Sequence, residues 1–197
     1  MSSSGPPEGE TRGPGHTSND KDPNVSRILT NDPASLTTTR LVLRSWTSAE
    51  AAAVRDDHRQ ADWAEDFPSE GDRVIASLFA EHPAWLEPYG QRLIIERATG
   101  LVVGGIGLFW PPDDGQLEIG YGVVATRRGR GYAAEATRAL TEFALTAPEV
   151  HTVFANVESA NPASVRVLEK AGFGLVGESR GPEGEHLACY RTVADRR

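Results

Sequence analysis

The sequence predicts a mixed α/β (α+β) fold in which helices flank a central mixed, mostly antiparallel sheet of about seven strands. Runs with an apolar residue at every second position recur along the chain, which is typical of strands. Stretches with apolar residues three and four positions apart lie between them, which is typical of helices. With 197 residues, the chain is long enough for one sizeable core.

The first 35 residues predict a disordered tail. They are rich in Ser, Gly, Pro, Asn, Asp and Glu, and large apolar side chains are almost absent before Ile28 and Leu29. Such a segment cannot offset the entropy cost of its own ordering by burying apolar surface. We therefore expect a tail over residues 1–35 and one folded domain over residues 36–197.

The domain is expected to begin with one strand and two helices. Residues 39–44 alternate, so that Leu41 and Leu43 share one face of a strand. Ser48 is the expected N-cap of the first helix. A second helix is expected over residues 72–81, where one face would carry apolar side chains, namely Val74, Ile75, Leu78 and Phe79.

Three strands are expected next. Residues 93–96 and 101–109 predict a hairpin, because the tight-turn sequence Ala-Thr-Gly separates them at residues 98–100. A further strand is expected over residues 116–124, after a turn rich in Pro, Asp and Gly.

The second half predicts two more helices and three more strands. Residues 132–146 show helical spacing until Pro148 stops it, and residues 151–158 alternate as a strand. Asn161 followed by proline is a strong signal for a helix start, and this helix is expected to end at Gly172. Two closing strands are then expected, over residues 173–179 and 187–193.

Composition limits the possible partners and the compartment. The formal charge is −8, from 20 basic and 28 acidic side chains, so nucleic acid is not an expected partner. The single cysteine, Cys189, excludes an internal disulfide and is read as a small apolar strand residue. The longest apolar stretch, residues 101–110, contains three glycines and is too short for a membrane span. No signal-peptide pattern or metal-ligand spacing of histidines is found, so we expect a cytoplasmic protein without a metal.

A glycine- and arginine-rich loop separates the strand at 116–124 from the helix at 132–146. Glycine lets the backbone approach an anion closely, and the amides at a helix start carry positive potential. Arg128 and Arg130 add charge, which favours a pyrophosphate at this turn. The loop alone is equally compatible with a basic surface turn. It matches neither the P-loop pattern nor the Rossmann glycine pattern.

Three motifs in order resemble the GNAT family of acetyltransferases. The loop reads Arg128-x-x-Gly131-x-Ala133, which matches that family's pattern Gln/Arg-x-x-Gly-x-Gly/Ala. The strand residues 117–121 and the run 161–173, with its Asn-x-x-Ser and Gly-Phe landmarks, are similar to the ribosomal-protein N-acetyltransferase branch. The resemblance covers residues 36–193. It implies a GNAT fold, in which the two central strands splay apart and acetyl-CoA enters the gap.

The resemblance also implies a set of residues that bind the cofactor. The backbone of Val123 and Val124 would hydrogen-bond the pantetheine as an added strand does. Asn161 would cap its helix and touch the pantetheine, with a cap-only role as the alternative. The pyrophosphate would be held by six consecutive backbone amides, those of Arg128, Gly129, Arg130, Gly131, Tyr132 and Ala133.

Acetyl transfer to an amine requires a proton acceptor for the amine and a proton for the leaving thiolate. Glu118, on the strand before the loop, is the expected base, and a solvated or cation-binding role is its alternative. An amide of Val123 or Val124 would stabilise the oxyanion. Many family members carry a tyrosine where this chain has Leu168. Ser164 is the proposed substitute acid, although a structural role near the helix start would also explain it.

The acceptor pocket is expected to involve the connection between the first two helices. That connection combines aromatic and acidic side chains, which suit a cationic and partly apolar amine, although a packed loop explains them equally well. Residues 181–186 are a further candidate segment. The expected acceptor-binding residues are Trp63, Glu65, Asp66, Phe67, Trp110 and Asn156.

Two functions follow from the sequence. The first is an N-acetyltransferase that passes the acetyl group of acetyl-CoA to a primary amine by direct attack in a ternary complex. The acceptor would be a protein N-terminus, an amino acid, a polyamine or an amine antibiotic. The alternative is a non-catalytic acyl-CoA-binding or regulatory domain, which the leucine at 168 keeps open. The protein is expected to act as a monomer or homodimer, without a membrane partner.

Overall fold

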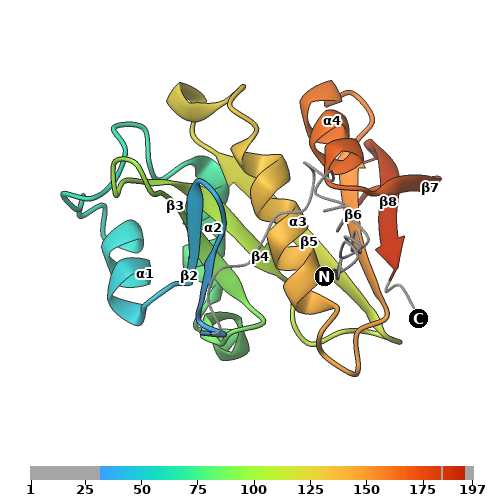
Figure 1. Ribbon diagram of the computed structural model, residues 1–197, viewed down its shortest axis with the longest axis horizontal. Coiled ribbons are helices and arrows are strands. Elements are labelled where there is room, and N and C mark those ends of the chain that lie inside the picture. Colours follow the sequence, from blue (N-terminus) through green and yellow to red (C-terminus); the bar gives the residue numbers. More distant parts are fainter. Residues whose placement is uncertain (1–31, 183, 194–197) are drawn as a thin grey trace, which may run out of the picture.

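A computed structural model describes residues 32–182 and 184–193. Within these residues, eight strands form one sheet in the order β1-β2-β3-β4-β5-β6-β8-β7, and four α-helices accompany it (Figure 1). Neighbouring strands are antiparallel except β5 and β6, which are parallel. The expected mixed, mostly antiparallel fold is therefore confirmed.

The elements follow the expected order. The strands are β1 (Ser35–Thr37), β2 (Leu41–Ser45), β3 (Gln91–Glu96), β4 (Val102–Leu108), β5 (Gln116–Val123), β6 (Thr152–Glu158), β7 (Gly174–Arg180) and β8 (His186–Val193). The helices are α1 (Ser48–Arg55), α2 (Glu70–Leu78), α3 (Tyr132–Ala144) and α4 (Pro162–Lys170), with short 3-10 turns η1 (Pro83–Leu86) and η2 (Ala125–Arg127).

One strand more than the expected seven is present, because residues 35–37 pair with β2. This strand begins at the last residue of the segment expected to be a disordered tail. The rest of that expectation, over residues 1–31, lies outside the described residues, and the domain boundary stays a prediction.

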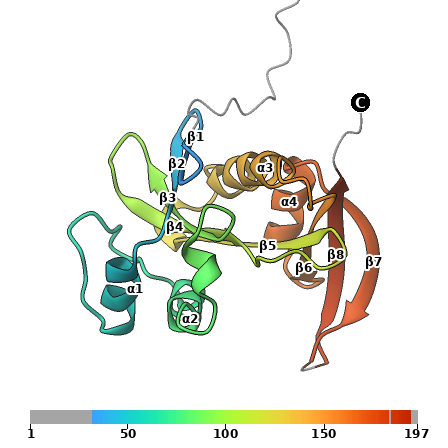
Figure 2. The same ribbon diagram turned by 90° about the horizontal axis from the view of Figure 1, so that it is seen from below.

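The helices cover both faces of the sheet. Figure 2 shows α1 and α2 on one face and α3 on the other, with α4 beside β6. The face of α3 that contacts the sheet carries Ala136, Ala139 and Leu140, each fully buried, as their helical spacing indicates.

Two helix starts differ from expectation. Thr47, not Ser48, caps α1: its hydroxyl accepts from Glu50 N at 3.2 Å, and the Glu50 carboxylate accepts from Thr47 N at 2.8 Å. This reciprocal capping box favours the earlier residue, because Glu lies three positions after Thr47.

The second helix, α2, begins at Glu70 rather than near Asp72. Ser69 is its N-cap, and Asp72 closes a capping box with it. Ala76 and Asp72 therefore occupy the inward face, and Val74, which was expected to be buried, is 51 % exposed. Val74 therefore does not share a packed face with Ile75, Leu78 and Phe79, because Asp72 and Ala76 take the inward positions of α2. Phe79 is buried and Ile75 and Leu78 are partly buried, as expected.

Candidate functional site

The two central strands, β5 and β6, are paired only over their first residues and then diverge. The parallel register of β5 and β6 joins only Gln116–Glu118 to Thr152–Phe154. Beyond it, β5 stays paired with β4 as far as Val123, and β6 stays paired with β8 as far as Glu158. The sheet is thus opened between β5 and β6, and no strand of the described part of the chain pairs with the edge of β5 that faces the opening.

Backbone groups of β5 point into this opening. Phe109 N donates to Glu118 O at 3.0 Å and Val124 N donates to Val103 O at 2.9 Å, which fixes the hydrogen-bonded positions between β4 and β5. Because these positions alternate along an antiparallel pair, Tyr121 and Val123 direct their N–H and C=O groups away from β4. Of the two valines expected to bind a ligand through their amides, only Val123 has its N–H turned to the gap.

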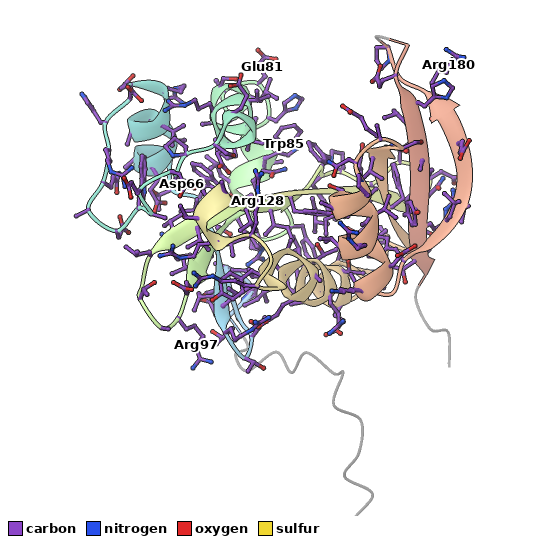
Figure 3. All side chains as sticks on the ribbon, turned by 90° about the horizontal axis from the view of Figure 1, so that it is seen from above. Asp66, Glu81, Trp85, Arg97, Arg128 and Arg180 are labelled. Carbon is purple, nitrogen blue, oxygen red and sulfur yellow. The ribbon has the colours of Figure 1, made fainter. Side chains whose placement is uncertain are left out.

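The Val123 carbonyl already has a partner in this structure. Arg128 Nε donates to it at 2.9 Å, which folds the arginine back over the end of β5. In Figure 3, Arg128 lies near the middle of the molecule, whereas Arg180 lies at the tip of the β7–β8 hairpin. Of the candidate segment 181–186, the described residues adjoin this tip, with His186 the first residue of β8, so they lie away from Arg128.

The loop at residues 128–133 has the geometry of an anion cradle. Gly129 and Gly131 have φ angles of 76° and 79°, a region that favours glycine. Gly131 is the N-cap of α3, and no side chain caps the helix there. The first amides of α3 therefore remain available to a ligand, and the helix dipole favours an anion at this position.

A buried carboxylate braces the loop from β3. Glu96 accepts a 2.5 Å hydrogen bond from the Tyr132 hydroxyl and lies 3.4 Å from both Arg127 Nε and Arg130 Nη1. The hydrogen bond from Tyr132 holds the pKa of Glu96 below its ordinary value and raises that of Tyr132. The Tyr132 side chain is therefore a brace, and only the backbone of this residue faces the loop.

The turn after β1 provides a second brace. Arg40 Nη1 donates to Arg130 O at 2.8 Å, and Arg40 Nη2 pairs with Glu135 at 2.6 Å. Thr38 Oγ1 also donates to Glu135 at 2.6 Å. Glu135 lies in the first turn of α3, where its charge would oppose a bound anion. The ion pair with Arg40 offsets that charge.

The connection between α1 and α2 supports the loop more than it forms a pocket. The Asp66 carboxylate accepts from Thr126 N at 2.9 Å and from Thr126 Oγ1 at 2.8 Å, so it fixes the turn η2. Trp63 and Phe67 are buried and meet edge to face at 5.1 Å. Glu65 is exposed. None of these four expected acceptor-binding residues reaches the pocket described below.

The structure brings Glu118 and Asn156 together across the sheet. Asn156 Nδ2 donates to Glu118 Oε1 at 3.2 Å, where β5 and β6 begin to diverge. The expected base and one expected acceptor residue are thus neighbours at the base of the opening.

The start of α4 lies on the other side of the opening. Asn161 Oδ1 accepts from Ser164 N at 3.1 Å, so the expected cap is confirmed. The Tyr121 hydroxyl donates to Ser164 O at 3.1 Å, and burial raises the pKa of Tyr121 to about 12. Leu168 is fully buried, so its position faces the core.

A pocket of about 310 Å³ lies between α2 and the sheet. The residues that β4 and β5 direct to this pocket include the glycines Gly105, Gly120 and Gly122, so the strand backbone forms the pocket floor. Trp110 is not part of its wall: it stacks on Tyr89 at 5.0 Å, and its carbonyl accepts from Trp85 Nε1 at 3.0 Å. The lining residues are Trp46, Ser69, Gly71, Asp72, Val74, Ile75, Gln91, Gly105, Ile106, Phe109, Gly120, Tyr121 and Gly122.

Sequence reasoning missed this pocket, although two signals mark it. Glycine at every second position of two paired strands, Gly105 with Gly107 and Gly120 with Gly122, predicts one face without side chains. The pattern Ser69-x-x-Asp72 predicts a helix start whose acidic side chain folds inward.

Within residues 32–182 and 184–193, no cluster of three or more His, Cys, Asp or Glu side chains is arranged to hold a metal ion. In the same ranges, no helix has the length and apolar character needed to cross a bilayer.

Comparisons with known proteins agree with this geometry. The family model described as "Acetyltransferase (GNAT) domain" matches residues 40–174. An uncharacterized N-acetyltransferase of Bacillus subtilis (strain 168), YjdG, is 35% identical over 82 residues, which are 41% of this chain and 49% of that protein. The chain spans about half the length of the curated relatives it matches.

Solved structures extend the similarity over most of the chain. An acetyltransferase from Agrobacterium tumefaciens str. C58 is 26% identical with a TM-score of 0.60, covering 85% of this chain and 99% of that one. RimL, a ribosomal L7/L12 alpha-N-protein acetyltransferase in complex with coenzyme A, is 16% identical with a TM-score of 0.62, covering 81% and 97%. The second likeness concerns the fold alone.

Proposed function

Because the chain belongs to the GNAT acetyltransferase family, we propose that it transfers an acetyl group from acetyl-CoA to a primary amine. Transfer occurs by direct attack of the amine on the thioester while both substrates are bound. The observation that carries the proposal is the opening between β5 and β6, which ends at the uncapped start of α3. An extended pantetheine arm can add to the free edge of β5 while the helix start receives its pyrophosphate.

The residues on the loop fit an anionic cofactor. The amides from Gly129 to Ala133 line the turn, whereas Arg128 N already donates to Ala125 O at 3.2 Å and is not offered to a ligand. The two positive φ angles let the backbone approach the phosphates closely. Arg128 and Arg130 are both exposed, so they can turn to the phosphates without leaving a buried charge. Asn161 keeps its cap and lies at the opening, where its amide group can also contact the pantetheine.

The Val123 N–H is the donor nearest the loop among those that β5 turns toward the opening, and we assign it to the thioester carbonyl. A fixed amide at that position stabilises the negative charge that develops when the amine attacks. Val124 contributes its backbone to β-sheet pairing instead, since its N–H is bound to Val103 O. Holding amine and thioester together supplies a further large part of the rate.

Proton transfers are assigned to side chains on the two sides of the opening. Glu118 accepts the proton of the attacking amine, directly or through water, and Asn156 holds one of its oxygens in place. Ser164, at the start of α4, donates a proton to the leaving thiolate.

A non-catalytic acyl-CoA-binding domain is the second candidate. One specific observation favours it, because the helix position at which many family members carry a tyrosine is here the fully buried Leu168. This candidate requires acetyl-CoA binding and no acetylation of any amine.

Acetyl-CoA consumption against a panel of primary amines separates the two candidates. The panel contains aromatic monoamines, polyamines, amino acids and short peptides with free N-termini, and free thiol release is measured. Calorimetric titration with acetyl-CoA is done on the same preparation. Binding together with turnover supports the transferase, whereas tight binding without turnover on any amine removes it in favour of the second candidate.

A further inference from the structure

The walls of the pocket between α2 and the sheet are mostly apolar. Trp46 and Phe109 provide aromatic surface, and Val74 and Ile75 provide aliphatic surface from α2. Val74 is 51 % exposed and lines the pocket, so it presents an apolar side chain there. An exposed large apolar residue at a concave site is typical of a ligand-binding wall.

One acidic side chain is among the residues that line this apolar pocket, that of Asp72. The residue is only 5 % exposed. Its Oδ2 atom accepts from Ser69 N at 2.8 Å and from Ser69 Oγ at 2.6 Å. Over the described ranges, Oδ1 receives no hydrogen bond and no Lys or Arg pairs with this carboxylate.

The glycine floor makes room for the second carboxylate oxygen. A Cβ atom at Gly105 would lie 2.5 Å from Asp72 Oδ1, so this oxygen lies directly above the backbone of β4. Gly105 is paired with Gly122, the residue before Val123. Asp72 Oδ1 therefore lies over β4, one strand away from the residue that precedes the amide assigned to the thioester carbonyl.

Asp72 differs from the other buried carboxylates in the part of the chain that the structure describes. Glu50 pairs with Arg44 at 2.6 Å. Glu135 pairs with Arg40, and Glu96 with two arginines, as described above. Burial raises the pKa of Asp72, since no cation offsets the cost of removing its charge from water. A buried carboxylate without a partner cation lowers the stability of the fold, and a cationic ligand can supply the missing partner.

We infer that Asp72 binds the ammonium group of the acceptor, and that the acceptor is a small amine with one cationic centre on an apolar, preferably aromatic, body. The inference rests on the proposed amine acetylation and narrows its substrate class. Asp72 binds the ammonium group, which loses its proton to Glu118 through water before the attack, while Trp46 and Phe109 receive the apolar end.

The lining also argues against two of the acceptor classes that the sequence left open. No Lys, Arg or His side chain is among the lining residues, so the carboxylate of an amino acid would have no partner there. A polyamine carries further ammonium groups, and the wall offers no second carboxylate to receive them. The volume of about 310 Å³ lies near the lower end of ligand pockets, which fits a small molecule.

The test uses a ligand that binds but cannot be acetylated. Trimethyl(2-phenylethyl)ammonium has a permanent charge on an aromatic body, and 2-phenylethanol is a neutral compound with the same aromatic body. Both are titrated by calorimetry into the wild-type protein, Asp72→Asn and Glu70→Gln. Glu70 is an exposed carboxylate in the same helix turn, so its variant controls for a general loss of negative charge.

We expect the wild-type protein and Glu70→Gln to bind the cation at least tenfold more tightly than the alcohol. Asp72→Asn should lose this preference and keep its affinity for the alcohol. Equal cation affinity in Asp72→Asn and in the wild-type protein would overturn the inference.

A second variant guards against a folding defect in the first. Val74→Lys places a cation at an exposed wall position near Asp72, where a long side chain can reach solvent. It should abolish the preference for the cation as Asp72→Asn does, and an unchanged preference would contradict the inference.

Turnover separates the inference from the proposed function. With acetyl-CoA, 2-phenylethylamine should be acetylated with a lower KM than phenylalanine, which adds only a carboxylate. A lower KM for phenylalanine would overturn the substrate class. Absence of turnover with every amine, with Asp72-dependent cation binding intact, would reject the acetylation and not the cation site.

Discussion

Arg40 Nη1 donates a 2.8 Å hydrogen bond to the carbonyl oxygen of Arg130, which joins the turn after β1 to the loop before α3. The same guanidinium pairs with Glu135 at 2.6 Å. It also lies over the Tyr132 ring, with Arg40 Cζ 5.0 Å from the ring centroid. The loop is therefore held in shape by groups that leave its amides uncovered. Preorganisation of this kind reduces the entropy that a bound ligand must offset.

Replacing Glu135 should destabilise the fold in a pH-dependent way. Burial alone would raise the pKa of Glu135, but hydrogen bonds from Thr38 and Arg40 outweigh it and hold the pKa below its ordinary value of 4.5. The carboxylate therefore contributes stability above that value, and the contribution is lost as the pH falls through the lowered pKa. Glu135→Gln should lower the free energy of unfolding by about 1.5–3 kcal/mol near pH 7, the range for hydrogen bonds to charged groups.

Urea unfolding at about pH 7 and at about pH 3 measures this difference. The gap between Glu135→Gln and the wild-type protein should narrow at the lower pH. Glu149→Gln, at an exposed position, serves as the control and should change little. A gap of the same size at both pH values would show that the charge of Glu135 is not the cause.

Changes in the loop should weaken acetyl-CoA binding. Arg128→Glu reverses a charge beside the pyrophosphate, and Gly131→Ala puts a Cβ at a φ angle of 79° and 3.5 Å from Arg40 Nη2. Each should weaken binding by at least tenfold, roughly 1.4 kcal/mol. Gly172→Ala is the matched control, because Gly172 also has a positive φ and an added Cβ would meet nothing within 4 Å. Calorimetry showing unchanged affinity in both loop variants would mean that the pyrophosphate binds elsewhere.

Loss of the Glu118 carboxylate should affect the rate more than binding. Glu118→Gln should lower kcat by about 100-fold or more, the usual range for a positioned general base. Asn156→Ala leaves the carboxylate but removes its 3.2 Å hydrogen bond, so we expect a smaller loss, roughly tenfold or less. Glu158→Gln, an exposed carboxylate on β6, controls for charge. Steady-state kinetics with a saturating amine make the comparison, and wild-type kcat in Glu118→Gln would contradict the assignment.

The source of the thiolate proton can be tested with a pair of variants. Ser164→Ala removes the proposed donor and should lower kcat by about tenfold, at the low end of general-acid effects, without changing the KM for acetyl-CoA. Tyr121→Phe removes the hydroxyl that donates to Ser164 O and should reduce stability more than kcat. The reverse pattern would assign the proton to Tyr121, the hydroxyl whose pKa burial raises to about 12. Melting temperatures and kcat of both variants decide the matter.

Much of the architecture could be predicted because local signals and tertiary structure agree. The alternation in β2 and β6 and the Asn161-Pro162 start of α4 appear where the sequence indicates them. The short strand β1 carried no such signal, since its three residues become a strand only by pairing with β2. The exposed Val74 was misassigned for a similar reason: apolar spacing does not distinguish a core face from the wall of a pocket.

The candidate site also has a part that the sequence predicts and a part that it does not. The loop could be predicted because glycine conformation and helix-start amides act locally. The acceptor side depends on which faces of distant segments meet, so aromatic and acidic composition pointed to Trp63 and Phe67, which lie in the core. Asp72 escaped notice because its sequence role, a capping box with Ser69, accounts for one carboxylate oxygen only.

Asp72→Asn should be at least as stable as the wild-type protein near pH 8, although it loses the cation site. Burial raises the pKa of Asp72 above its ordinary value of 3.8, and the hydrogen bonds from Ser69 only partly offset this. A carboxyl group with a raised folded-state pKa binds its proton more tightly in the folded state. Its ionised form therefore lowers stability at every pH above that pKa, and the cost disappears as the pH falls through it.

Asparagine keeps an oxygen that can accept from Ser69 N, so the helix cap survives while the buried charge is removed. Thermal melting from about pH 8 to about pH 4 should show the variant melting at or above the wild-type temperature at the upper end, with the difference shrinking toward the lower end. Glu70→Gln should show no such trend, because Glu70 is exposed. A lower melting temperature for Asp72→Asn throughout would mean that capping dominates at this position. The expected result instead identifies a side chain that costs stability in the free protein, which is the trade-off typical of a ligand-binding residue.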